Sequence, residues 1–168
     1  MPTVPLHPAL VHVPLGLALI IPIVAAALGF ALWRGLLPRR SWLVFVVLQA
    51  LLVAGAGAAL WSGGQEEERV ERVTGKAPVH RHEEAAEVFL WGAAGVLALG
   101  AAVLVGPART APAFAALAFA GTLVVTGLAI RTGKAGGELV YVHGGARAYR
   151  ASGAAPVDPP ADRGHDDD

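Results

Sequence analysis

Residues 42 to 61 read WLVFVVLQALLVAGAGAALW, and this stretch decides the fold. Gln49 is its only strongly polar side chain, and a tryptophan stands at each end. An apolar run of about 20 residues is long enough to cross a hydrocarbon core as a helix, and tryptophan is enriched at both membrane surfaces. The stretch therefore predicts a transmembrane helix anchored at both interfaces.

Three further runs have the same apolar character and comparable length. The first contains two prolines, which a membrane helix tolerates when neighbouring groups satisfy the freed carbonyls. The run at residues 83–105 starts in an acidic turn, which suits a helix N-terminus, and stops at Gly106-Pro107. We predict an all-α integral membrane protein, a bundle of four transmembrane helices at about residues 9–33, 42–61, 83–105 and 111–131.

The overall composition supports a membrane environment and excludes several functions. Of the 168 residues, 55% are hydrophobic and only 15% are charged. The formal net charge of zero provides no basic field, so we do not expect nucleic-acid binding. The chain has no cysteine, which excludes disulfides, iron–sulfur clusters, thiolate zinc sites and covalently attached c-type haem.

The chain divides into a membrane-embedded domain at residues 1–150 and a tail at residues 151–168. The tail is rich in Ala, Pro, Gly and Asp, so we expect a disordered acidic segment in which His165 has no specific role. The segment before the first helix has no Lys or Arg, so we do not expect a cleaved signal peptide.

The loops indicate how the bundle is oriented. Arg34, Arg39 and Arg40 lie between the first two predicted helices and Arg109 between the last two, with no acidic residue in either turn. Short basic loops face the cytoplasm, so both termini and the mixed-charge loop at residues 62–82 are expected to be extracytoplasmic.

Five histidines are expected on that extracytoplasmic side, although they are far apart in the sequence. His7 and His12 open the first helix, His80 and His82 precede the third, and His143 follows the fourth. Four crossings return the chain to the side where it started. This predicted convergence is the strongest functional signal in the sequence.

Imidazole is the common ligand of haem and of many metal ions, although a single interfacial histidine is more often a hydrogen-bonding group. We predict that the converging histidines bind haem b or a divalent metal ion. The expected cofactor ligands are His12, His82 and His143, and the expected additional donors for a metal ion are His7, His80, Glu83 and Glu87.

The segment after the fourth helix is expected to form a separate small element. Glycine pairs at residues 136–137 and 144–145 flank the short apolar piece at residues 139–142, which predicts a folded lid or a short interfacial helix. The segment lacks the pattern of a phosphate-binding loop, and the chain has no nucleophile elbow or His-Glu-x-x-His motif. We therefore favour a redox or binding module over a hydrolase or transferase.

Three motifs resemble the bacterial membrane family named domain of unknown function 2231. They are LHPALVHVPLG at residues 6–16, HEEA at residues 82–85 and GGELVYVHG at residues 136–144. Val13 departs mildly from the family, which often has an aromatic residue there. The resemblance implies a multi-pass protein of the bacterial inner (plasma) membrane, and relatives fused to Rieske or cytochrome c modules imply a redox setting.

Three functions remain open at this stage. The first is electron transfer through a bound haem b or metal ion, with a redox protein as partner on the extracytoplasmic side. The second is a structural or accessory subunit without a cofactor, which includes a subunit of an oligomer. The third is proton or metal-ion transport past Glu87 and His12, which the scarcity of polar residues at the membrane midplane disfavours.

Overall fold

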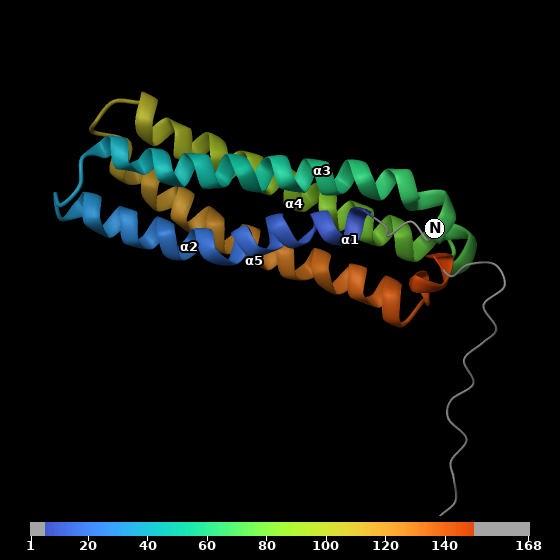
Figure 1. Ribbon diagram of the computed structural model, residues 1–168. Coiled ribbons are helices and arrows are strands. Elements are labelled where there is room, and N and C mark those ends of the chain that lie inside the picture. Colours follow the sequence, from blue (N-terminus) through green and yellow to red (C-terminus); the bar gives the residue numbers. More distant parts are fainter. Residues whose placement is uncertain (1–5, 150–168) are drawn as a thin grey trace, which may run out of the picture.

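The computed structural model describes residues 6–149, and these form a bundle of four long helices that run alternately up and down (Figure 1). Four helical segments are long and apolar enough to cross a membrane, and the described residues include no strand, which confirms the predicted fold class. The predicted tail, with His165, lies outside the described residues. The elements are α1 (Leu6–Leu10), α2 (His12–Trp33), η1 (Arg39–Trp42), α3 (Leu43–Thr74), α4 (Lys76–Val105), α5 (Ala111–Tyr141) and η2 (Gly145–Tyr149).

The prediction of a loop at residues 62–82 is wrong. Helix α3 continues from Trp61 to Thr74, and α4 begins at Lys76, so only Gly75 separates them. Gly75 has φ +79°, a conformation that glycine adopts without strain, and it reverses the chain. The loop was inferred from polarity, but residues 65–72 are rich in Glu and Arg, which are good helix formers. By the helical rise, α3 extends about 20 Å beyond Trp61.

The prediction of a separate lid at residues 139–142 is also wrong. Helix α5 runs without interruption through Gly133, Gly136 and Gly137 to Tyr141. Packing against α4 outweighs the modest helix-breaking preference of these glycines. A turn at Gly144, with φ +70°, then leads into η2, which packs against α3 and α5. The helices therefore form a polar collar that continues the bundle beyond the apolar layer.

The apolar core is packed through small residues. Phe45 is fully buried, its ring stacks on Trp42 with 4.7 Å between ring centres, and Gly100 of α4 lies directly against it. A Cβ atom at Gly100 would overlap the Phe45 ring. Gly121 of α5 is in the same situation, because an added Cβ would come within 2.6 Å of a Val96 methyl group. Small residues thus let the helices approach closely, as in other membrane bundles.

Polar side chains in the apolar layer donate hydrogen bonds to backbone carbonyls of neighbouring helices. Gln49 Nε2 of α3 lies 2.9 Å from the Ala93 carbonyl oxygen of α4, and Thr126 Oγ1 of α5 lies 2.7 Å from the Ala18 carbonyl oxygen of α2. At the opposite end from the histidines, the Arg39 guanidinium donates to the carbonyls of the last turn of α4. These bonds fix the helices relative to one another in a medium that offers no water.

Candidate functional site: a pocket lined by histidines

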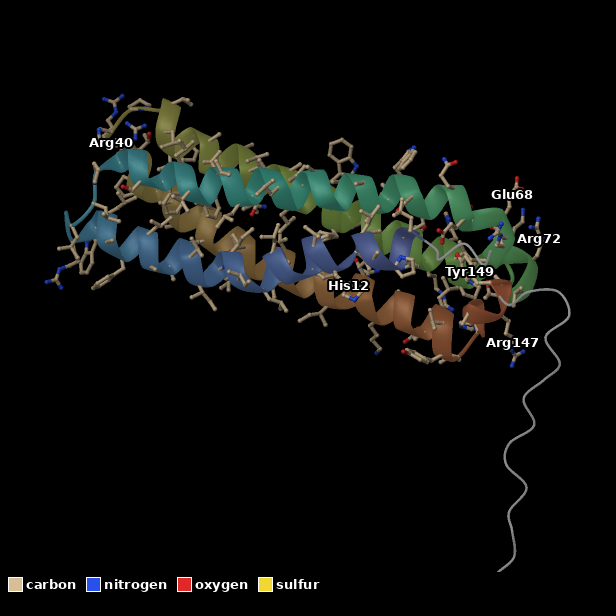
Figure 2. The ribbon with its side chains drawn as sticks, viewed as in Figure 1. His12, Arg40, Glu68, Arg72, Arg147 and Tyr149 are labelled. Carbon is tan, nitrogen blue, oxygen red and sulfur yellow. The ribbon has the colours of Figure 1, made fainter. Side chains whose placement is uncertain are left out.

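A hollow lies at the end of the bundle that contains α1, the α3–α4 turn and the last turns of α5. We call it the histidine end; Arg40 marks the opposite end, and Glu68, Arg72 and Tyr149 mark this one (Figure 2). The pocket has a volume of about 450 Å³, and its walls are mainly apolar and glycine-rich. Its polar lining residues are His7, His12, Glu66, Glu67, His82, Glu83, Thr132 and Tyr141.

His7 reaches the pocket from α1, and its ring is held in a defined orientation. Its Nδ1 atom lies 2.8 Å from the Ala59 carbonyl oxygen and 3.2 Å from Ser62 Oγ, both on α3. The Ser62 hydroxyl itself donates to the Ala59 carbonyl. A carbonyl can only accept, so the Nδ1 atom carries the proton. The lone pair of Nε2 is therefore left available for a ligand.

His82 reaches the pocket from α4 and faces His7. The two ring centres are 6.1 Å apart, and the ring planes are nearly perpendicular, at 81°. The Nδ1 atom of His82 is buried and has no hydrogen-bond partner. A buried nitrogen without a partner is costly, and such a group in a native protein calls for a ligand or a bound water. Both imidazoles thus have a nitrogen without a protein partner.

Two glycines provide the space in which these rings sit. An added Cβ at Gly63 would lie 3.2 Å from His7 Cε1, and one at Gly136 would lie 3.1 Å from His82 Cε1. Both distances are shorter than ordinary van der Waals contact. Any larger residue at either position would push the ring that it touches, so the position of each ring depends on a glycine of the neighbouring helix.

The structure does not pair the other predicted site residues in the way that it pairs His7 with His82. His12 lines the same pocket but its side chain is exposed, and Glu83 lines it with a partly buried carboxylate. The exposed side chain of His80 lies 3.2 Å from Glu84 and 3.8 Å from Glu83 on its own helix. Glu87 is exposed and does not line the pocket. His143 lines a second hollow between α4 and α5, so the structure does not place it beside His7 and His82.

Few side chains in this pocket are close enough together to bind one metal ion. Among residues 6–149, no three His, Cys, Asp or Glu side chains come together in a way that could hold a metal ion. The pocket therefore presents two opposed imidazoles. The sequence places His7 and His82 at the same end of the bundle, but it does not predict that these two rings lie side by side, because that depends on the rotation of each helix about its axis.

A short segment after α5 fixes one wall of the pocket. The Tyr149 hydroxyl of η2 donates a hydrogen bond to Glu66, and the Arg69 guanidinium lies 5.8 Å from the centre of the Tyr149 ring. Burial raises the pKa of Tyr149, and the Glu66 carboxylate raises it further. The phenol therefore stays protonated and keeps η2 attached to α3.

These features define a class of protein, a compact four-helix membrane protein with a mainly apolar pocket within the polar collar at one end of the bundle. The family described as "Predicted membrane protein (DUF2231)" matches residues 3–148, and the chain belongs to it. The resemblance seen in the three motifs is thus confirmed. A search of curated proteins found no match, and neither did a search of solved structures.

Proposed function

We propose that this membrane protein binds haem b between His7 and His82 and serves as a one-electron carrier at the membrane surface. The observation that supports the proposal is the 6.1 Å between the two ring centres, with a nitrogen free of protein partners on each ring. A metal bonded at about 2 Å to one nitrogen of each of two opposed imidazoles holds the ring centres about 6 Å apart. His7 and His82 are therefore the residues that would hold the haem iron, and the bound haem would supply one-electron redox chemistry.

The number of ligands favours haem over a bare metal ion. A structural or catalytic zinc site takes three or four protein ligands, whereas the macrocycle of haem already supplies four nitrogens to its iron. Two histidines are then sufficient. The glycine-rich, mainly apolar walls offer room for a flat macrocycle, and the Ala59 carbonyl orients His7 in the way that a backbone acceptor orients a metal-ligating histidine. A divalent metal ion is the alternative group that the same two imidazoles could bind.

The charge distribution supports an extracytoplasmic position for this pocket. The end opposite the histidines carries Arg34, Arg39, Arg40 and Arg109 in its two turns, which contain no acidic residue. Placing these turns in the cytoplasm follows the positive-inside rule. We infer that the protein lies in the bacterial inner membrane with both termini outside, where a redox protein would exchange electrons with the haem.

The visible spectrum of the protein, purified in mild detergent from cells supplied with a haem precursor, tests the proposal. We expect a Soret band in the oxidised form, a sharp α band after reduction with dithionite, and about one haem b per chain. Stoichiometric zinc or copper without haem would contradict the proposal in favour of a metal site. Absence of haem and of metal would contradict it in favour of an accessory subunit or a transporter.

The Gly136→Ala variant is expected to bind haem about tenfold more weakly, because its methyl group displaces the His82 ring, and displacing an oriented ligand costs 10- to 100-fold in affinity. Haem titration of the apoprotein measures this affinity. Gly127→Ala on the same helix is the matched control, since a Cβ at Gly127 has no neighbour within 4 Å and Gly127 does not line the pocket. Equal affinities of the two variants would show that the position of the His82 ring does not matter for binding.

A further inference from the structure

A second groove lies between α4 and α5 at the histidine end. Its volume is about 230 Å³, and it shares no lining residue with the pocket of His7 and His82. Its lining is strongly charged, which sets it apart from the mainly apolar pocket. The charged and titratable side chains that line it are Arg81, Glu84, Arg131, Lys134, Glu138 and His143.

None of the three cations of this groove forms an ion pair with a carboxylate in the described part of the chain. Within residues 6–149, no carboxylate oxygen lies within 4.0 Å of a charged nitrogen of Arg81, Arg131 or Lys134; the ion pairs found there all involve His80. Glu84 is one of the partners of His80, at 3.2 Å. Three cations, Arg81, Arg131 and Lys134, and two carboxylates, Glu84 and Glu138, line the groove, so its formal charge is positive.

The groove is also at the level of the lipid headgroups. Arg131 directly follows the apolar segment of α5 at residues 111–130, and Lys134 lies about one turn further, or about 4.5 Å along the helix axis. The polar layer of a bilayer adds about 5–7 Å on each side of the hydrocarbon core. Both side chains are exposed, as is Arg81 on the adjacent helix. A lipid phosphate can therefore approach all three.

We propose that this groove binds the headgroup phosphate of an anionic phospholipid from the leaflet at the histidine end. Each guanidinium can donate two parallel hydrogen bonds to phosphate oxygens, and the lysine adds a point charge. Basic pockets between transmembrane helices bind lipid headgroups on the cytoplasmic side of membranes, and the same attraction between cations and phosphate acts at the histidine end. The net positive charge favours an anionic lipid over a zwitterionic one, whose cationic headgroup would meet Arg81, Arg131 and Lys134.

Native mass spectrometry of the detergent-solubilised full chain, titrated with phosphatidylglycerol, tests this assignment. We expect the unmodified protein to retain one phosphatidylglycerol molecule at least tenfold more tightly than the Arg131→Gln/Lys134→Gln variant. Phosphatidylcholine is expected to bind as weakly to the unmodified protein as phosphatidylglycerol does to the variant. Inorganic phosphate at millimolar concentration is expected not to displace the lipid.

The matched control is Arg72→Gln/Lys76→Gln, which removes the same charge from exposed residues near the α3–α4 turn that do not line the groove. It is expected to retain phosphatidylglycerol like the unmodified protein. Equal retention by both double variants would overturn the proposal, and displacement by inorganic phosphate would overturn the assignment to a lipid. If the Arg131→Gln/Lys134→Gln variant does not fold, Arg81→Gln alone serves as the test, with a several-fold loss expected.

Discussion

For the proposed haem site, the His82→Ala variant is expected to be purified with less than about a tenth of the haem of the unmodified protein, because one of the two residues that would hold the haem is lost. The His82 ring is half of the opposed pair, and its Nδ1 atom is buried without a partner. Alanine would leave the iron with one protein ligand. His7→Ala is expected to cause a comparable loss. The measurement is the ratio of Soret to protein absorbance after purification.

The controls for these variants are His12→Ala and His80→Ala. His12 lines the pocket with an exposed side chain, and His80 is paired with glutamates on its own helix, so both variants are expected to keep their haem. Free imidazole added to His82→Ala during haem titration is expected to restore part of the binding, since it can occupy the vacated space. Loss of haem in His12→Ala with retention in His7→Ala would show that His12 is the true ligand.

The Gly100→Ala variant is expected to lower the stability of the bundle by about 1–3 kcal/mol, the usual cost of overpacking a dense core. The new methyl group would overlap the fully buried Phe45 ring, which is stacked on Trp42 and cannot move freely. Helices α3 and α4 must then separate locally. The melting temperature in detergent measures the effect.

Gly95→Ala is the matched control, because Gly95 lies on the same helix with an exposed surface and an added Cβ would have no neighbour within 4 Å. Its stability is expected to stay the same or to rise slightly, since alanine has the higher helix propensity. An equal fall in melting temperature for both variants would show that glycine at position 100 does not serve close packing.

The four membrane crossings could be predicted from the sequence because hydrophobicity is a local property. The run at residues 42–61 is apolar regardless of its neighbours, and lipid requires a helix there. The helical extensions could not be predicted in this way. Residues 62–74 are polar, so hydropathy ends the span near Trp61, while the helix continues to Thr74 in water.

The sequence predicted an imidazole site, and this stays a prediction; the pairing of His7 with His82 could not be predicted from the sequence. The sequence indicated an imidazole site, with His12, His82 and His143 as its expected ligands. The structure brings His82 to His7, and it places His143 in a separate groove. Which imidazole faces another depends on the rotation of each helix about its axis, and this rotation is set by packing at contacts such as Gly63 against His7 and Gly136 against His82.

The sequence by itself thus determined the helical class, the number of crossings and the presence of histidines near the ends of several helices. Only the tertiary structure decided that α3, α4 and α5 extend into a collar and that His7 and His82 oppose one another across a pocket. The physical reason is the range of the forces involved. Burial in lipid acts on each segment separately, whereas ring positions depend on contacts of about 3 to 4 Å between segments that are remote in the chain.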